Sequence, residues 1–310
     1  MPAVLSGTET EMGTETVGAV TQDIQPTRTG HLDVDGQQVW WEYHGDGSRE
    51  AVCLLNGLAM HTKAWYSFLP MLTDAYDVVL YDFLGQGQSS QDDVPYSIPE
   101  FARHLKLILD EVGQDRVHLM GISYGGFIAL DFARAYQERL HTMTLSGILL
   151  SHEKLFQMYQ DISLRFYRGS EEAFALYTHY MYEKIFGEDF AAAIPSEQME
   201  AMRQRFYDRY VGSRHCLIRL TEAQDPFFAA LGANLPGYRA IATPTLMIVG
   251  GQDRAIPLWQ QRKIFELLPN TRWEEIPGCG HVAYLEKPKQ FFGMIRSFMA
   301  AKSLDFEWPG

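Results

Sequence analysis

Short apolar runs separated by turn residues mark the first part of the chain. Leu32–Val34 and Val39–Tyr43 flank the dipeptide Asp35-Gly36, which is typical of a hairpin turn. Further apolar runs follow at Ala51–Leu55, Val78–Tyr81 and Val117–Met120. Short runs of this kind suit strands that are buried on both faces of a parallel sheet.

Helical patterns alternate with these strands. Residues 98–112 place Phe101, Leu105, Ile108 and Val112 on roughly one helical face. A second helix is expected from just after Ser123 to about Tyr136, and a strand at Met143–Leu145. Alternating strands and helices predict an α/β fold with a mostly parallel, doubly wound sheet.

The alternation stops between residues 151 and 236, where the sequence is helical and rich in aromatic residues. It resumes with a strand at Thr245–Val249, a helix near Leu258–Leu268, a strand at Arg272–Ile276 and a helix over Pro288–Ala301. Because so long a connection without structure is implausible, we expect an inserted helical cap. Its place in the chain puts it over the carboxyl ends of the strands, where open α/β sheets bind ligands.

This pattern divides the chain into three parts. We expect residues 1–30 to be a disordered or loosely attached tail, because they combine Thr, Glu and Gly without an apolar run. Residues 31–150 and 237–303 form the predicted α/β core, and residues 151–236 form the helical cap, or lid. No run is apolar over about 18 residues, so no membrane span is expected.

Charge and cysteine content exclude several classes of protein. The net charge is −13, with 26 Lys and Arg residues against 39 Asp and Glu residues, which argues against a nucleic-acid or anionic-membrane partner. The three cysteines are far apart, so we expect no disulfide framework or zinc site and a cytoplasmic location. The sequence has no phosphate-binding loop, metal-ligand cluster or dinucleotide fingerprint, so no cofactor and no metal are predicted.

The strongest chemical signal is the segment Gly121-Ile122-Ser123-Tyr124-Gly125. It matches the pattern G-x-S-x-G, follows a predicted strand and opens a predicted helix, which is the context of a nucleophile elbow. Small residues must flank the serine because the turn is tight. We therefore predict Ser123 as the nucleophile, with helix N-terminal N–H groups facing a developing oxyanion.

A serine hydroxyl needs a base, and the base needs an acid to orient it. His281 follows the last predicted strand in a glycine-rich loop, whereas the other nine histidines have no comparable context. Asp253 follows the strand that ends near Val249, which gives the chain order Ser123, Asp253, His281. Asp82 is a second candidate for the acid, and Cys279 is interpreted as a small loop residue.

An oxyanion hole needs two hydrogen-bond donors. One predicted donor is the backbone N–H of Tyr124, directly after the nucleophile. The other is the N–H of Leu58, in the loop that follows the Ala51–Leu55 strand.

Together these residues resemble the α/β-hydrolase superfamily from about His31 to Ala301. The elbow, the segment Asp82–Ser89, the loop Gly250–Asp253 and the Gly280-His281 pair follow each other in family order. The resemblance implies the α/β-hydrolase fold and a serine hydrolase activity.

The oxyanion loop departs from the commonest family pattern. Many members have His-Gly where this chain has Asn56-Gly57. Asn-Gly followed by Met60 is similar to 3-hydroxyacyl-carrier-protein transferases and rhamnolipid hydroxyalkanoyl synthases, which move hydroxyacyl chains between carriers. Gly121 departs from that subgroup, which has alanine or serine there, so esterases and lactonases remain equally open.

The predicted cap is rich in aromatic residues and methionines. Such residues either form an apolar acyl pocket or pack the cap on the core, and we expect only a few to touch substrate. They are Phe156, Met158, Tyr159, Phe166, Tyr167, Phe174, Tyr177, Tyr180, Met181, Tyr182 and Phe186.

The leading functional hypothesis is hydrolysis of a carboxylic ester, lactone or thioester with an apolar acyl group, through an acyl-enzyme on Ser123. Acyl transfer to an alcohol or carrier is a second hypothesis. A carrier protein would need a basic patch, for which the cap offers Arg203, Arg205, Arg209, Arg214 and Arg219.

Carbon–carbon bond hydrolysis with the same triad and a non-catalytic receptor role on the same fold also stay open. Epoxide and haloalkane hydrolases are disfavoured, since they need a carboxylate in place of Ser123.

Overall fold

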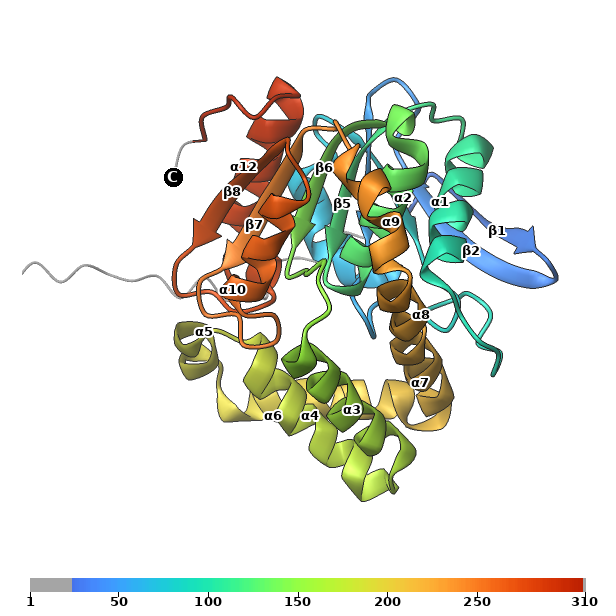
Figure 1. Ribbon diagram of the computed structural model, residues 1–310. Helices are drawn as coiled ribbons and strands as arrows, with labels where there is room; N and C mark the ends of the chain where they lie inside the picture. The colour runs from blue at the N-terminus through green and yellow to red at the C-terminus, as the bar shows by residue number, and fades with distance from the viewer. Residues whose placement is uncertain (1–23, 309–310) are drawn as a thin grey trace, which may run out of the picture.

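An eight-stranded sheet forms the centre of the molecule in the computed structural model, which describes residues 24–308 (Figure 1). The strand order is β1-β2-β4-β3-β5-β6-β7-β8; β1 and β2 run antiparallel to their neighbours and β3 to β8 are parallel. The strands are β1 (Arg28–Val34), β2 (Gln37–His44), β3 (Ala51–Leu55), β4 (Asp77–Tyr81), β5 (Val117–Ile122), β6 (Leu140–Ser146), β7 (Thr245–Gly250) and β8 (Thr271–Ile276). The predicted mostly parallel, doubly wound sheet is confirmed.

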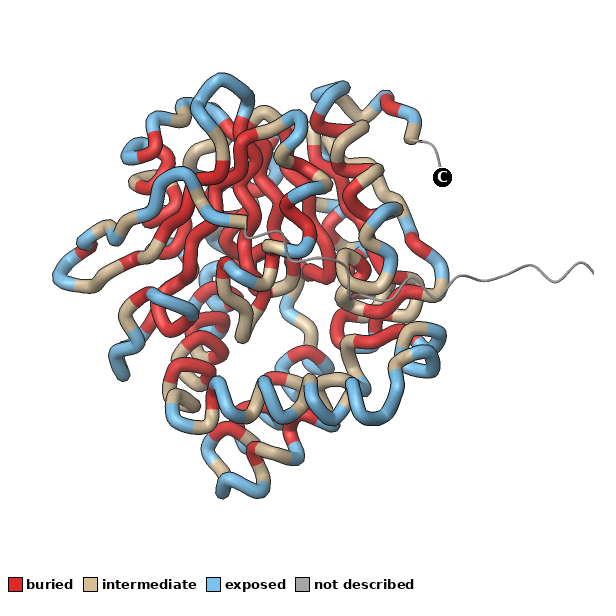
Figure 2. The backbone as a smooth tube through the Cα atoms, turned by 180° about the vertical axis from the view of Figure 1, so that it is seen from behind, coloured by how far each residue is buried: buried red, intermediate tan, exposed pale blue. Residues whose placement is uncertain are grey.

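Alternate residues of the central strands enter two separate layers of apolar side chains. On β3, Cys53 packs in the layer that holds α1 (Ile98–Val112) and α2 (Tyr124–Tyr136), whereas Leu54 packs on the opposite face. That opposite face is covered by the 3₁₀ helix η1 (Thr62–Met71) and by α12 (Pro288–Ala301). Figure 2 shows buried residues concentrated in the strands, with exposed residues along the outer turns. Burial on both faces explains why these strands appear in the sequence as continuous apolar runs.

The connection between β6 and β7 is helical in the part of the chain that the structure describes. It contains α3 (Lys154–Arg168), α4 (Glu171–Ile185), α5 (Glu188–Ala193), α6 (Ser196–Tyr210), η3 (Val211–Ser213), α7 (Arg214–Glu222), α8 (Gln224–Ala229) and α9 (Leu231–Arg239). In Figure 1, α3 to α7 lie beyond one end of the sheet, while α8 and α9 run back alongside α2. The cap therefore covers one end of the strands, as the sequence predicts.

The boundary at residue 236 does not separate two packed units. Helix α9 runs across it to Arg239, and Phe227, Leu231 and Tyr238 pack in the main core, where the rings of Phe127 and Phe227 are 5.3 Å apart. Helices α3, α4, α6 and α7 share a smaller apolar cluster of their own. We therefore propose that the cap comprises α3–α7 (residues 154–222) and that α8 and α9 belong to the core.

Two further boundaries differ from the sequence prediction. Residues 1–23 of the expected tail lie outside the described residues, but Arg28–Gly30 already belong to β1, because they pair with Trp41–Tyr43 of β2. The helix expected over 258–268 divides into a short α10 (Leu258–Gln261) and the 3₁₀ helix η4 (Arg262–Glu266).

The remaining short helices are η2 (Gln137–Arg139) and α11 (Ala283–Glu286). Among the described helices, none combines the length and the apolar character that crossing a bilayer requires.

Candidate active site

Ser123 occupies a strained turn between β5 and α2. Its backbone angles are φ 48° and ψ −119°, a region that residues other than glycine rarely adopt. A Cβ atom on Gly121 would lie 2.6 Å from the carbonyl oxygen of Gly125, and one on Gly125 would lie 2.6 Å from that of Asn56. Both glycines are therefore needed for the turn to pack against its surroundings, which explains the G-x-S-x-G pattern.

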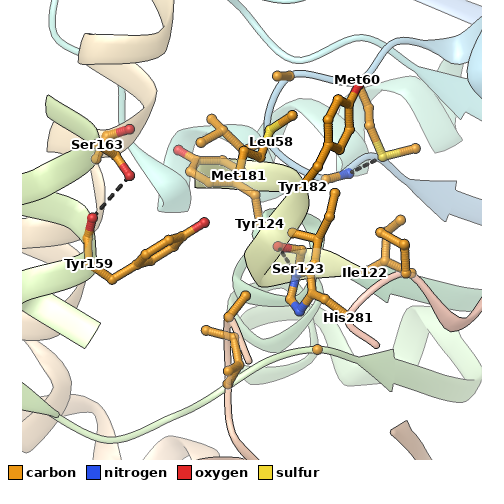
Figure 3. A pocket seen from close by; sticks show the side chains of 18 of the residues that line it. Leu58, Met60, Ile122, Ser123, Tyr124, Tyr159, Ser163, Met181, Tyr182 and His281 are labelled. Atoms are coloured by element: carbon orange, nitrogen blue, oxygen red, sulfur yellow. Dashed lines mark hydrogen bonds between the residues drawn. The ribbon is translucent and has the colours of Figure 1, made fainter. Parts of the chain in front are cut away.

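The structure brings the three predicted side chains into one hydrogen-bonded chain. His281 Nε2 lies 2.9 Å from Ser123 Oγ (Figure 3), and His281 Nδ1 lies 2.8 Å from Asp253 Oδ2. Asp253 follows β7 and His281 follows β8, so both come from loops at the same end of the sheet as the elbow. The geometry is that of a nucleophile, a base and an orienting acid.

Asp253 accepts further hydrogen bonds besides the one from His281. Its Oδ1 accepts the backbone N–H groups of Ala255 (2.9 Å) and Ile256 (2.8 Å), and its Oδ2 also accepts Gln261 Nε2 at 3.0 Å. The side chain of Asp253 is almost fully buried. Gln261 was not predicted from the sequence, since a glutamine in a helix gives no signal of its own. These bonds fix the carboxylate in the orientation that His281 needs.

The charge of Asp253 controls the protonation of His281. Burial by itself lowers the pKa of an imidazole, but the negative charge of Asp253 and its hydrogen bond outweigh that effect. The pKa of His281 is consequently raised above its ordinary value. Asp253 thus favours the protonated form of the His281 imidazole.

The residues of both predicted oxyanion donors lie on the cavity wall beside Ser123. Leu58 and Tyr124 line the same cavity as Ser123 and His281. Within residues 24–308, no hydrogen bond uses the backbone N–H of Leu58 or of Tyr124 as its donor, so neither donor is occupied within the protein. The loop that carries Leu58 is held by a hydrogen bond from Met60 N–H to Gln86 Oε1 at 2.7 Å.

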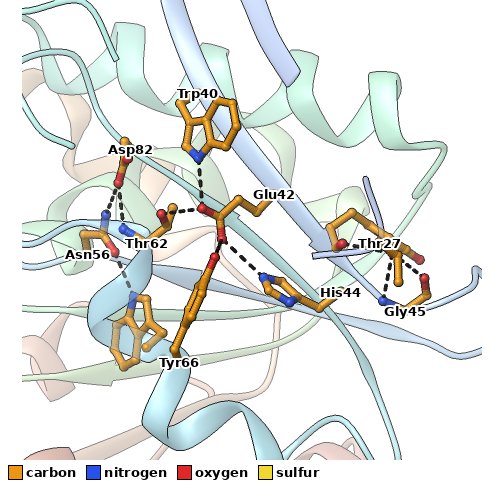
Figure 4. A network of polar contacts seen from close by, with 11 residues as sticks. Thr27, Trp40, Glu42, His44, Gly45, Asn56, Thr62, Tyr66 and Asp82 are labelled. Atoms are coloured by element: carbon orange, nitrogen blue, oxygen red, sulfur yellow. Dashed lines mark hydrogen bonds and ion pairs between the residues drawn. The ribbon is translucent and has the colours of Figure 1, made fainter. Parts of the chain in front are cut away.

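Asp82, the second candidate for the acid, does not contact His281. Its carboxylate accepts the backbone N–H of Thr62 at 2.7 Å and Asn56 Nδ2 at 3.4 Å (Figure 4), and also the backbone N–H of Gln88 at 2.9 Å. The reason is topological, because β4 lies on the far side of β3 from β5 and β7. Burial raises the pKa of Asp82 to about 7 in spite of these donors. Asp82 therefore does not take the position of the acid beside His281, and its hydrogen bonds hold Asn56, Thr62 and Gln88 in place.

Asn56 is a structural member of the same network. Its Nδ2 donates to the carbonyl oxygen of Tyr81 at 3.1 Å, and its Oδ1 accepts Trp65 Nε1 at 2.7 Å. Thr62 continues the network to the buried Glu42, whose Oε1 accepts the threonine hydroxyl at 2.7 Å (Figure 4). The Asn56 side chain thus holds the loop to β4 and to Trp65, and both its amide nitrogen and its amide oxygen have partners within the protein.

A cavity of about 290 Å³ lies between the core loops and the cap. Figure 3 shows Tyr159 and Ser163 of α3 on one side of it, with Met60 and Ile122 on the opposite side. Seven of the cap residues singled out from the sequence line it, namely Phe156, Tyr159, Tyr167, Tyr177, Met181, Tyr182 and Phe186. Sequence reasoning missed four polar lining residues, which are Gln160, Ser163, Thr221 and Gln224. Among the described residues, no Lys, Arg, Asp or Glu lines this cavity.

A thiol nucleophile or a bound metal ion has little support at this site. Burial raises the pKa of the Cys279 thiol to about 12, so the thiolate is strongly disfavoured beside His281. Within residues 24–308, no group of three His, Cys, Asp or Glu side chains is arranged to hold a metal ion.

Comparison with known proteins places this geometry in a family. Residues 50–288 match the model of the alpha/beta hydrolase fold family. The chain is 27% identical over 296 residues to the 2-hydroxy-6-oxononadienedioate/2-hydroxy-6-oxononatrienedioate hydrolase of Paraburkholderia xenovorans, covering 93% of this chain and 99% of that protein. It is 24% identical over 276 residues to a proline iminopeptidase of Lactobacillus delbrueckii subsp. bulgaricus, covering 82% and 91%.

A solved structure is similar over nearly the whole length. An alpha/beta hydrolase enzyme from a Medee basin deep-sea metagenome library superposes with a TM-score of 0.81 at 25% identity, covering 90% of this chain and 100% of that one. The family match spans more than half of the chain and includes the elbow and the loops that carry Asp253 and His281. The chain therefore belongs to the alpha/beta hydrolase fold family.

Proposed function

We propose that this protein is a serine hydrolase that cleaves a carboxylic ester, lactone or thioester with an uncharged, largely apolar acyl group. The observation that carries the proposal is the hydrogen-bonded chain from Ser123 Oγ through His281 to Asp253, which opens onto an apolar cavity. That it is a hydrolase fits the family and the relatives. We infer the kind of bond that is cleaved from the triad and the apolar cavity, and not from the relatives.

In the first half-reaction, Ser123 Oγ attacks the acyl carbon while its proton passes to His281 Nε2. The oxyanion that forms accepts hydrogen bonds from the backbone N–H groups of Leu58 and Tyr124. When the tetrahedral intermediate collapses, the leaving alcohol or thiol takes the proton from His281 Nε2. In the second half-reaction, water attacks the acyl carbon and gives a proton to His281 Nε2; this proton passes to Ser123 Oγ when the second tetrahedral intermediate collapses and releases the acid.

The lining of the cavity favours an uncharged substrate. The named substrate of the Paraburkholderia relative is a dioate, which carries two carboxylate groups. Burying such charges requires cationic partners, because an unpaired buried charge is costly. Among the described residues, the cavity wall has no Lys or Arg to supply them. Carbon–carbon cleavage of a dianionic substrate is therefore less favoured for this chain.

Acyl transfer to a carrier protein is also less favoured. Of the arginines proposed as a carrier-binding patch, Arg203 pairs with Glu200, and Arg219 pairs with Asp93 and Glu222. Arg214 donates to the backbone carbonyl groups of Val211 and Gly169. These contacts neutralise or occupy three of the five arginines, which weakens the patch that a negatively charged carrier would bind, so we favour water as the acceptor.

We also propose a reducing compartment such as the cytoplasm for this enzyme. Cys53, Cys216 and Cys279 are all buried free thiols. Free cysteines persist where the redox environment keeps thiols reduced.

The test is a chain-length series of p-nitrophenyl esters, run with and without alcohol and hydroxyacyl-thioester acceptors. The proposal expects nitrophenol release that does not depend on acceptor, and covalent labelling of Ser123 by a fluorophosphonate probe. Product on the acceptor with poor hydrolysis would replace the hydrolase with an acyltransferase. An absence of both labelling and turnover would favour a non-catalytic receptor. Cleavage of carbon–carbon bonds alone would favour a carbon–carbon bond hydrolase.

A further inference from the structure

One buried amide in the cavity wall has no partner in the protein. Gln160 lies on α3 of the cap, its side chain is 6% exposed, and it lines the same cavity as Ser123. Its Nε2 makes no hydrogen bond to any group among the described residues. A buried donor without an acceptor destabilises the folded protein, so such groups are rare and usually have a functional reason.

The polar groups nearest in the lining use their donors within the protein. Ser163 Oγ donates to the carbonyl oxygen of Tyr159 at 3.0 Å, and Thr221 Oγ1 donates to that of Leu217 at 2.8 Å. Gln224 Nε2 makes only a long contact of 3.4 Å with the carbonyl oxygen of Thr221. Within residues 24–308, the buried side-chain donors of this wall that lack an acceptor are thus the Gln160 amide and the Tyr124 hydroxyl, and the amide is the one that the cap supplies.

Helical spacing directs Gln160 toward the substrate side of α3. Phe156, Ser163 and Tyr167 lie four residues before, three after and seven after Gln160, so they share its face, and all of them line the cavity. The same face is otherwise mainly aromatic. A single amide donor set in an apolar wall can fix the position of one polar atom on a ligand.

We propose that the acyl part of the substrate carries an uncharged oxygen, a carbonyl or a hydroxyl, that accepts a hydrogen bond from Gln160 Nε2. This inference rests on the proposed function, because it refines the acyl group that is bound while Ser123 reacts. A carboxylate is disfavoured, since among residues 24–308 no Lys or Arg lines the cavity. Gln160 would then be a specificity residue in the cap that favours one position of the oxygen along the chain.

The experiment uses p-nitrophenyl esters of one chain length, with a keto group at successive carbons, compared with the unsubstituted ester. The inference expects one keto position, or two adjacent ones, to raise kcat/KM about ten-fold over the plain ester, the size of one buried hydrogen bond. In Gln160→Met, which keeps the side-chain length and removes the amide, that ratio should fall to about one.

A matched control is Gln260→Met. Gln260 is also buried, in α10, also has an unpartnered amide, and does not line the cavity. The keto preference should survive in Gln260→Met, because the readout is the ratio of two substrates and not the rate. Loss of the preference in both variants would assign the effect to a general change in packing and overturn the inference.

A binding measurement separates this inference from the proposed function. Calorimetry with Ser123→Ala gives the affinities of the uncleaved keto and plain esters without any turnover. A keto preference that Gln160→Met abolishes supports the inference even if the wild-type protein cleaves neither ester. Equal affinities for all keto positions and the plain ester would mean that only water occupies the Gln160 amide, and would overturn it.

Discussion

The backbone N–H of His281 donates a hydrogen bond to the carbonyl oxygen of Ile185 at 2.7 Å. The loop that carries the base is therefore bonded directly to the last turn of cap helix α4. A second link runs through Glu286, whose Oε1 accepts Gly187 N–H at 3.1 Å and whose Oε2 accepts Gly280 N–H at 3.0 Å. The position of the cap and the position of His281 are thus set by shared hydrogen bonds.

We predict that Glu286→Gln lowers kcat/KM for esters by about ten-fold. A glutamine keeps one acceptor oxygen but presents an amide N–H₂ to the other backbone donor, so one of the two links is lost. Small displacements of a catalytic group are enough to cost this much. Steady-state kinetics measures the effect, with a change at the exposed Glu266, Glu266→Gln, as control. Wild-type kinetics in Glu286→Gln would contradict a coupling between cap and base.

Ser123→Ala should abolish ester turnover, with a fall in kcat of about 10⁶-fold if Ser123 acts as the nucleophile. The fold should remain, because the serine side chain is not needed for packing and alanine adds no atoms. Stopped assays on nitrophenyl esters measure the loss, and the melting temperature checks the fold. Retained turnover in a purified sample would remove Ser123 from the mechanism.

Asp253→Asn should reduce kcat by about 10⁴-fold through loss of control over the His281 tautomer. It should also move the acid limb of the pH–rate profile. His281 must be neutral to accept the serine proton, so activity rises with pH through its pKa. Asp253 holds that pKa above its ordinary value, whereas burial alone lowers it. The limb of the variant should therefore lie at lower pH than that of the wild type.

The control for Asp253→Asn is Asp82→Asn, which changes a carboxylate that bonds the oxyanion loop and not His281. We expect its rate to fall much less than that of Asp253→Asn; the rate is the readout, because Asp82 has a pKa of about 7 and can itself contribute to the acid limb. A larger loss of activity in Asp82→Asn than in Asp253→Asn would show that the acid had been assigned wrongly.

The sheet was predictable because its strands are buried on both faces. Such strands must be apolar at every position, as Ala51–Leu55 and Thr245–Gly250 largely are, and that leaves a direct trace in the sequence. The elbow was predictable for a similar reason, since only glycine fits at Gly121 and Gly125. Local steric demands of this kind can be recognised in a single chain.

Contacts between segments that are distant in the sequence could not be predicted in this way. Gln261 supports Asp253, and Gln160 reaches the cavity, only because tertiary packing brings their helices there. Asp82 and Asp253 both follow parallel strands, and only the strand order tells which one His281 meets. The end of the cap was equally hidden, because α9 is helical like the cap but packs in the core.

The oxyanion hole can be tested at Leu58 by removing its backbone donor. Leu58→Pro deletes the N–H group and should lower kcat by about 10²-fold to 10³-fold, the usual cost of one oxyanion donor. Leu58→Ala keeps the N–H and removes most of the side chain, so it controls for changes in the cavity wall and should lose far less. Melting temperatures of the two variants show whether proline has disturbed the loop held by Gln86. If both variants lose the same activity, the side chain of Leu58 matters and its N–H does not, and the second oxyanion donor must be sought elsewhere in the loop.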